Sequence, residues 1–333
     1  MDSGNFVRRP TRRDFLRTAG TLAGSGALAH LFPKALAGAG PRVPRQGGGA
    51  DDDALAAARA NFEKAPIVPE KLSDNLTLLS GPGGNVVVLH GADGKLIVDT
   101  FTQLAWDRFE KTLEGLGRAP LKFAIDSHWH WDHTDNNAHV RAAGATLIAH
   151  MNTLKRMSET HDLDVIGLHF DPSPADALPQ RTFKEAHEMN FNGEHIALGY
   201  IAPAHTDSDI FIHFQKANVL HMGDAFFNGM YSYIDRETGG SIGGMIAGAT
   251  KMLAMVDKDT KIVPGHGPLG NKSDLYMFRN MLITARARVR RLKSSGKSLE
   301  QAIAAKPLSD LDPDWGKGFL NADGFVHVIY TTL

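Results

Sequence analysis

Residues 127–133 have the sequence SHWHWDH and directly follow the apolar run LKFAI of residues 121–125. The apolar run is typical of a buried β-strand, so the polar stretch is predicted to form the loop at its carboxyl end. Alternate side chains of an extended segment point the same way, which places His128 and His130 on one side. Asp132 and His133 can then turn toward a second centre. A polar surface loop with two packed tryptophans is the alternative, but it does not account for so many ligand-type side chains together.

Further ligand-type residues stand at predicted strand ends later in the chain. His205, Asp224 and His266 each follow a short apolar run, and glycine and proline on both sides of His266 predict a tight turn. Rigid scaffolds place functional side chains on such loops. A single histidine after a strand is more often structural, but the combination predicts a metal site. Its predicted ligands are His128, His130, Asp132, His133, His205, Asp224 and His266.

The remaining hydrophobic pattern predicts strands in two clusters, each with helices beside it. This arrangement favours an α/β fold in which two mixed sheets pack face to face with helices outside. Residues 159–180 are rich in Pro and Asp and are predicted to be a long loop, which in compact domains is often a functional lid. The predicted strands are 76–80, 85–89, 95–99, 121–125, 145–149, 187–191, 194–201, 209–214, 219–221 and 261–263, and the predicted helices are 51–65, 103–116, 134–143, 242–255 and 272–293.

The order of these motifs resembles that of the metallo-β-lactamase superfamily. The motif at residues 128–133, followed by His205, Asp224 and His266, matches the family's pattern, and Asp99 matches its first, structural motif. The resemblance covers roughly residues 76–269 and implies an αββα sandwich. One departure is Ser208, which stands where the family's third motif usually has glycine.

The resemblance also implies a dinuclear metal centre with Asp224 as the bridging ligand. Two Zn²⁺ ions are expected, with iron or manganese as alternatives, because nitrogen and oxygen ligands suit all three metals. A hydroxide shared by two cations can attack a carbonyl carbon, and Asp132 is the residue expected to orient it and move its proton. By resemblance, one metal would be bound by His128, His130 and His205, and the other by Asp132, His133 and His266.

These features predict a metal-dependent hydrolase that acts on the ester, lactone, thioester or amide bond of a small molecule. A periplasmic metallo-β-lactamase and an iron-dependent oxidoreductase of the same superfamily are the alternatives. Zinc β-lactamases usually carry cysteine or a small residue where Asp224 stands, which favours the first interpretation. The chain contains no cysteine, so thiolate ligands, disulfides and a cysteine nucleophile are excluded.

Several other residues have a functional and a structural interpretation. Tyr231 and Tyr233 are predicted to bind substrate, with packing as an equally good alternative. His221 is predicted to be structural. Thr206, Asp207 and Asp209 are expected either to hydrogen-bond with His205 or to begin a strand, and Arg286, Arg288, Arg290 and Arg291 are expected on a solvated helix face.

Residues 1–37 resemble a twin-arginine export signal and are set aside from the fold. Arg12 and Arg13 lie in the sequence TRRDFLR, a moderately apolar run follows over residues 18–32, and Ala35-Leu36-Ala37 offers a cleavage site. We therefore predict the twin-arginine machinery as a partner and a periplasmic protein without stable membrane insertion after cleavage. Removal of this segment, with six basic and two acidic residues, changes the net charge from −1 to −5, which does not favour nucleic-acid binding.

The predicted organisation has one catalytic domain with additions at both ends. Hydrophobic residues make up 42% of the 333-residue chain, which is ample for a large core. The predicted segments are the signal peptide at 1–37, a linker and short helix at 38–70, the catalytic domain at 71–294 and a C-terminal extension packed on it at 295–333.

Overall fold

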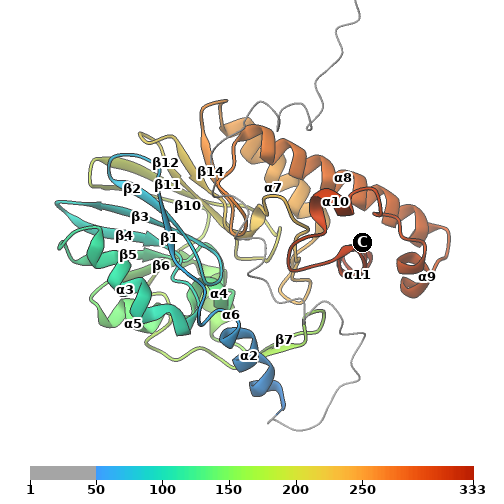
Figure 1. Ribbon diagram of the computed structural model, residues 1–333, viewed down its shortest axis with the longest axis horizontal. Coiled ribbons are helices and arrows are strands. Elements are labelled where there is room, and N and C mark those ends of the chain that lie inside the picture. Colours follow the sequence, from blue (N-terminus) through green and yellow to red (C-terminus); the bar gives the residue numbers. More distant parts are fainter. Residues whose placement is uncertain (1–49) are drawn as a thin grey trace, which may run out of the picture.

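In the computed structural model, which describes residues 50–333, two β-sheets pack face to face and helices cover both outer sides (Figure 1). The predicted signal peptide and most of the predicted linker lie outside the described residues. Buried side chains from both sheets form one cluster between them, which includes Leu78 and Val98 from the first sheet and Ile196 and Phe214 from the second. The αββα sandwich predicted from the sequence is therefore confirmed.

The first sheet has the strand order β1-β2-β3-β4-β5-β6-β9. Neighbouring strands are antiparallel from β1 to β4 and parallel from β4 to β9. The strand β3 shows why both faces are buried: Val87 and Leu89 face the second sheet, whereas Val86 and Val88 face the outer helices. The strands are β1 (Val68–Lys71), β2 (Leu76–Ser80), β3 (Asn85–Gly91), β4 (Gly94–Val98), β5 (Leu121–Ile125), β6 (Thr146–His150) and β9 (Arg181–Phe183).

The second sheet has the strand order β10-β11-β12-β13-β14. Its strands are antiparallel except for the parallel pair β13 and β14. A separate hairpin of β7 and β8 lies outside both sheets. The strands are β7 (His161–Leu163), β8 (Leu168–Phe170), β10 (Ala186–Phe191), β11 (Glu194–Tyr200), β12 (Ile210–Phe214), β13 (Val219–His221) and β14 (Lys261–Val263).

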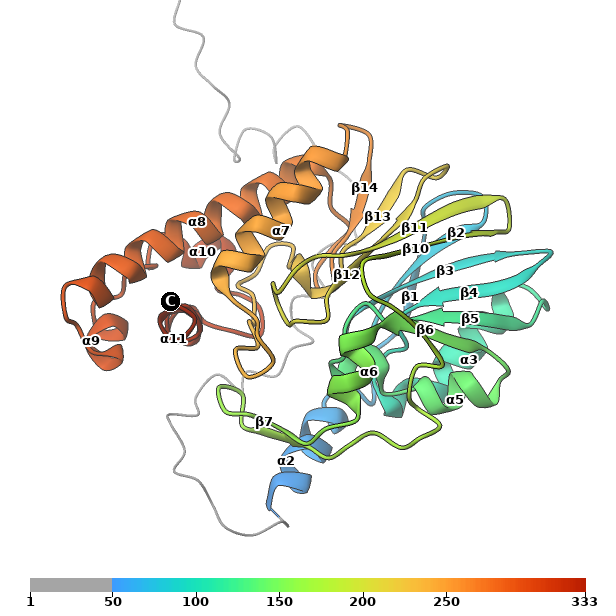
Figure 2. The same cartoon turned by 180° about the vertical axis from the view of Figure 1, so that it is seen from behind.

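Helices cover the outer face of each sheet (Figure 2). The helices α3 and α5 pack on the first sheet, and α7 and α8 pack on the second, where α11 covers α8 in turn. Within residues 50–333, no helix is both long and apolar enough to cross a membrane. The helices are α2 (Ala50–Ala60), η3 (Gln103–Ala105), α3 (Trp106–Gly115), α4 (Trp131–Thr134), α5 (Asn137–Ala142), α6 (Met151–Met157), η4 (Gly223–Ala225), α7 (Ile242–Met255), α8 (Lys272–Ser294), α9 (Leu299–Ala304), α10 (Asp312–Trp315) and α11 (Ala322–Thr331).

Some elements differ from the prediction. The segment 159–180 is not a continuous loop, because it contains the hairpin of β7 and β8. The predicted helix 134–143 begins later, as α5 at Asn137, because the short helix α4 ends at Thr134 and the chain turns at residues 135–136. The short strands β1 and β9, with four and three residues, were missed because they are too short to show a period.

Candidate metal centre and active site

The loops that follow five strands meet at one edge of the sandwich. Asp99 follows β4, the histidine-rich stretch 127–133 follows β5, and the loops after β11, β13 and β14 bring the remaining ligand-type residues. All seven residues predicted as ligands come together there. They form two groups, each of which could hold a cation. The first group is His128, His130, His205 and Asp224, and the second is Asp132, His133 and His266.

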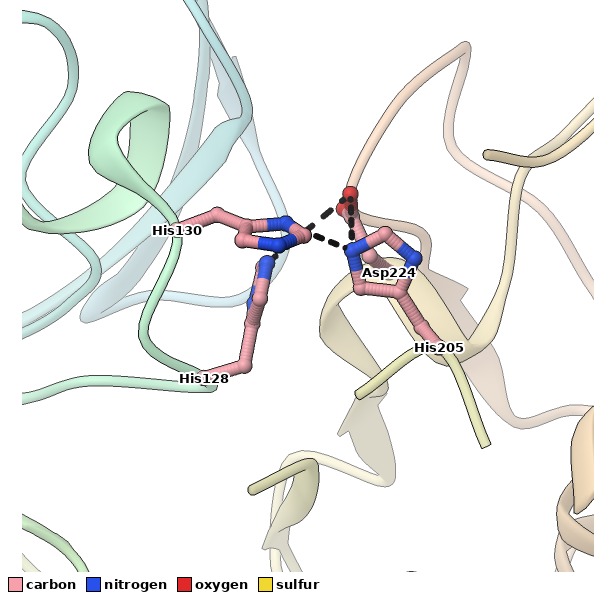
Figure 3. Close-up of side chains that lie close together, drawn as sticks. All are labelled: His128, His130, His205 and Asp224. Carbon is pink, nitrogen blue, oxygen red and sulfur yellow. Dashed lines mark hydrogen bonds and ion pairs between the residues drawn. The ribbon is translucent and has the colours of Figure 1, made fainter. Parts of the chain in front are cut away.

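The first group is formed by three histidines around the carboxylate of Asp224 (Figure 3). The Nδ1 atom of His130 lies 2.8 Å from Nε2 of His205, and this Nε2 lies 3.3 Å from Oδ2 of Asp224. The Nε2 atom of His128 is buried and has no hydrogen-bond partner within residues 50–333. Buried polar atoms are rarely left in this way, so this nitrogen fits the position of a metal ligand.

The second group lies on the other side of Asp224. Nε2 of His266 is 3.2 Å from Oδ2 of Asp132 and 3.4 Å from Oδ2 of Asp224. Nε2 of His133 is 3.2 Å from Oδ1 of Asp224. The carboxylate of Asp224 thus lies between the two groups, with Oδ2 close to both His205 and His266 and Oδ1 close to His133, which is the arrangement expected of a bridging carboxylate.

Hydrogen bonds on the outer side of the imidazole rings fix how they are oriented. His133 donates from Nδ1 to Asp99 at 2.8 Å, and His205 donates from Nδ1 to the carbonyl oxygen of Tyr233 at 2.8 Å. His130 donates from Nε2 to Asp235 at 3.0 Å. Each ring therefore turns its other nitrogen toward the centre, where it could ligate a metal ion.

The charges in the site favour a bound cation. Burial lowers the pKa of His205 to about 4, so its imidazole is neutral and able to ligate near neutral pH. Burial would also lower the pKa of His266, but Asp224 and Asp132 outweigh it and raise this pKa to about 9. Burial would raise the pKa of Asp224, but His266 and His133 hold it well below its usual value. Metal ions would displace the shared protons and neutralise the carboxylates.

Asp235 is a supporting residue that the sequence analysis missed. It accepts hydrogen bonds from His130 and from the hydroxyl of Thr238, at 3.0 and 2.5 Å. Although burial opposes it, these bonds lower the pKa of Asp235 to about 2. Asp235 lies outside every motif, so only its position in space reveals this contact.

The surroundings of His205 are also held by hydrogen bonds. Asp209 accepts from the backbone N–H of His205 at 2.7 Å and from the hydroxyl of Thr206 at 2.6 Å. Asp207 instead pairs with Arg156 at 2.7 Å. Ser208 is buried and donates from its backbone N–H to Thr206 at 3.0 Å. The departure from glycine at this position thus leaves an ordered turn around His205.

Two glycines allow the loops to approach the ligand-type side chains. A Cβ atom on Gly265 would lie 1.9 Å from Oδ1 of Asp224, and one on Gly84 would lie 2.2 Å from the ring of His133. Real Cβ atoms do not make such contacts, so any larger residue would force the backbone or the ligand to move.

The other singled-out residues occupy different places. His221 is buried, and its ring contacts the backbone of Asn85 and Gly223 at 3.3 and 3.2 Å, which is a structural arrangement. Arg288 donates to Asp310 at 2.9 Å, so it anchors the C-terminal extension and is not simply a solvated charge.

The two tyrosines predicted to bind substrate have separate roles in the structure. The hydroxyl of Tyr231 donates to Asp312 at 2.9 Å, and its ring stacks on Phe325. This position does not fit the predicted substrate contact, because the hydroxyl faces the C-terminal extension. Tyr233 lines the pocket beside the ligand cluster, and its buried hydroxyl has no hydrogen-bond partner in the described part of the chain.

One pocket opens directly onto the ligand cluster. His130, Asp132, Asp224 and His266 form its polar end. The rest of its lining is almost entirely apolar and comes from α2 and the residues just after it, α4, the hairpin of β7 and β8, the segment after Asp224 and the C-terminal extension. These residues are Ala58, Phe62, Trp131, Ile166, Leu168, Phe227, Met230, Tyr233 and Phe319.

Solved structures with a similar fold include hydrolases of two kinds. The DIM-1 metallo-β-lactamase has a TM-score of 0.56 and 18% identity, over 67% of this chain and 100% of that one. A metallo-β-lactamase from Pontibacter korlensis has a TM-score of 0.56 and 15% identity, over 66% and 99%. The inverting sec-alkylsulfatase Pisa1 from Pseudomonas sp. has a TM-score of 0.60 and 14% identity, over 84% of this chain but only 51% of that one. At these identities the likeness concerns the fold.

The comparison with curated proteins gave no match. The model of the metallo-β-lactamase superfamily matches residues 79–266, which is more than half of the chain and includes every predicted ligand. With this match, the αββα sandwich and the His/Asp cluster at its edge, the chain belongs to the metallo-β-lactamase superfamily.

Proposed function

We propose that this protein is a dinuclear, zinc-dependent hydrolase that cleaves the ester, lactone, thioester or amide bond of a small molecule. The position of Asp224 carries the proposal, because its carboxylate lies 3.2–3.4 Å from nitrogens of both ligand groups. The proposed ligand sets are His128, His130 and His205 for one metal and Asp132, His133 and His266 for the other, with Asp224 shared between them.

The residues around the pocket have complementary tasks in this reaction. Two divalent cations held there would supply a water that ionises near neutral pH and would polarise the substrate carbonyl. Asp132 keeps a side-chain exposure of 15% and lines the pocket, so it can orient the attacking water and accept its proton. The hydroxyl of Tyr233, which has no hydrogen-bond partner among residues 50–333, can donate a hydrogen bond to the substrate oxygen, where negative charge develops.

Metal content and activity of matched variants test the proposal. We expect close to two zinc ions per chain by elemental analysis of protein purified without chelator. The Asp132→Ala variant should lose nearly all hydrolytic activity and keep its fold, whereas His221→Ala should keep its metal. A folded, active and metal-free wild type would disprove the proposal. A content of two iron ions with oxygen consumption would favour the oxidoreductase alternative instead.

For the substrate we propose lactones or thioesters in preference to β-lactams. The support is that a carboxylate, Asp224, stands between the ligand groups, in a chain that has no cysteine. The solved β-lactamases share the fold at 15–18% identity, which does not extend to the substrate. Comparison of kcat/KM on zinc-loaded protein decides, and efficient penicillin or carbapenem hydrolysis without lactone or thioester turnover would contradict the ranking.

We also propose that the protein is exported to the periplasm by the twin-arginine route. The support is the order of the three parts in residues 1–37, a paired arginine, an apolar run and a small-residue cleavage site. Replacing Arg12 and Arg13 by lysine should leave the precursor in the cytoplasm. Mass spectrometry of the periplasmic wild type should show a mature chain that begins near Gly38, and an intact Met1 there would contradict export with cleavage.

A further inference from the structure

The entrance to the ligand cluster has an apolar wall built from segments that are far apart in the sequence. Phe62 follows α2, Leu168 lies in β8, Met230 follows the Asp224 motif and Phe319 precedes α11. Phe62 and Phe319 lie outside residues 79–266, the region that the family model covers. The wall therefore combines residues of the common fold with residues from the segments that precede and follow it.

Specific contacts hold these two flanking segments in place. Arg59 makes a bidentate ion pair with Asp135, at 2.6 and 2.7 Å, and thereby fastens α2 beside the site. Tyr231 fastens the C-terminal extension, because its backbone N–H donates to the carbonyl oxygen of Trp315 at 2.9 Å and its hydroxyl donates to Asp312. Phe62 and Phe319 are thus fixed parts of the pocket wall.

The pocket also lacks positive side chains. Among the described residues that line it, there is no lysine and no arginine. Arg59 and Arg156 line a neighbouring pocket, and they are already paired with Asp135 and Asp207. A carboxylate placed against this wall, away from the ligand cluster, would lose its hydration without a positive side chain to pair with, which is costly. A hydrocarbon group placed there would gain from leaving water.

From this lining we propose that the pocket selects neutral substrates that carry an aliphatic or aromatic group next to the scissile carbonyl, and rejects those in which this group ends in a carboxylate. This inference rests on the proposed hydrolase function and names its substrate class.

A series of thioesters on zinc-loaded full-length protein tests the selection. We expect kcat/KM to rise from acetyl through butyryl and hexanoyl to octanoyl, by about fourfold for each buried methylene group until the pocket is full. For substrates of equal length that end in a carboxylate, kcat/KM should be at least about tenfold lower than for their neutral counterparts. A flat series, or a preference for the carboxylates, would overturn the proposal.

Variants of Phe319 test whether the apolar wall of the pocket is the cause of the substrate selection. Phe319→Ala should lower kcat/KM for the octanoyl substrate by about 10- to 100-fold more than for the acetyl substrate. Phe319→Arg should improve the carboxylate-ended substrates at the expense of the neutral ones. Leu104→Ala, which truncates an apolar side chain with 44% exposure outside the pocket, is the control and should change neither. An equal loss on short and long substrates in Phe319→Ala, with metal content kept, would contradict the inference.

Measuring the affinity for alkanols, which the protein does not hydrolyse, tests the apolar pocket independently of the proposed hydrolase activity. Calorimetry on the zinc-loaded wild type should show affinity rising from 1-butanol to 1-octanol, and Phe319→Ala should remove the rise. If the protein binds zinc but hydrolyses none of the carbonyl substrates, the proposed function fails while a chain-length-dependent affinity still supports the pocket. Affinity that is independent of chain length overturns the pocket inference whatever the activity.

Discussion

At the residue scale, the site depends on side chains that orient the ligands as much as on the ligands themselves. Asp99 is held with a φ of 66°, a backbone conformation that few residues other than glycine adopt. From there its carboxylate accepts hydrogen bonds from His133 at 2.8 Å and from the backbone N–H of Ser127 at 2.7 Å. The strained turn after β4 is thereby connected to both ends of the histidine-rich stretch.

Asp235 offers a test of such support, because its carboxylate hydrogen-bonds with His130 and with no other predicted ligand among the described residues. Removal of its carboxylate in Asp235→Ala should free the ring of His130 to rotate, and loss of a partner of this kind typically costs 10- to 100-fold in metal affinity. Competition with a zinc-binding dye measures this. Glu237→Gln is the control, because Glu237 pairs with Arg236 and touches no predicted ligand. Unchanged affinity in Asp235→Ala would show that His130 is oriented without Asp235.

At the scale of single elements, the short loops at the strand ends decide the geometry. The loop after β14 passes so close to the loop after β13 that Gly265 donates its backbone N–H to the carbonyl oxygen of Gly223 at 2.7 Å. The two short parallel strands are thus continued by a backbone contact that places His266 beside Asp224. Such an approach requires glycine, because there is no room for a Cβ atom.

We expect Gly265→Ala to displace the carboxylate of Asp224 and to reduce metal content, because the added Cβ would overlap with Oδ1. Gly115→Ala in α3 is the matched control. Nothing lies within 4 Å of a Cβ atom there, so this change should leave metal content unaltered and stability equal or slightly higher. Elemental analysis and thermal unfolding measure both effects. Full metal content in Gly265→Ala would mean that the loop yields without moving Asp224.

At the scale of the whole molecule, the site joins the two halves of the sandwich. His128 and His133 come from the loop after a strand of the first sheet, whereas His205, Asp224 and His266 come from loops of the second. Cations bound between them would therefore connect the two sheets. The sheets also share the buried cluster between them, so the fold does not depend on metal alone.

Metal removal should accordingly lower the stability without unfolding the chain. Bound cations stabilise the folded state by mass action, by about 2.7 kcal/mol for each site when free metal is at a hundred times its Kd. Thermal unfolding in the presence of a strong chelator should therefore shift to a lower Tm, with an unchanged circular dichroism spectrum at room temperature, and added zinc should reverse the shift. An identical Tm with and without the chelator would argue against tightly bound metal.

The sequence by itself determined the seven ligand-type residues, most strands and the sandwich fold. Each of these signals is local: a histidine or aspartate stands directly after a run such as Leu121–Ile125 whose side chains must be buried. The family resemblance supplied the expected partition of the ligands. The ligand-type residues and their partition could be predicted because the strand ends of a sandwich meet at a common edge.

Only the tertiary structure decided which distant segments complete the site. Asp235 meets His130 across 105 positions of sequence, and Tyr231, not Tyr233, faces the C-terminal extension. Phe62 and Phe319 become neighbours of one pocket although no periodic pattern connects them. Such contacts depend on how the sheets and helices pack and on where the loops lie in space. Packing between segments that are far apart in the sequence produces no periodic pattern, so a rule that examines neighbouring residues does not detect it.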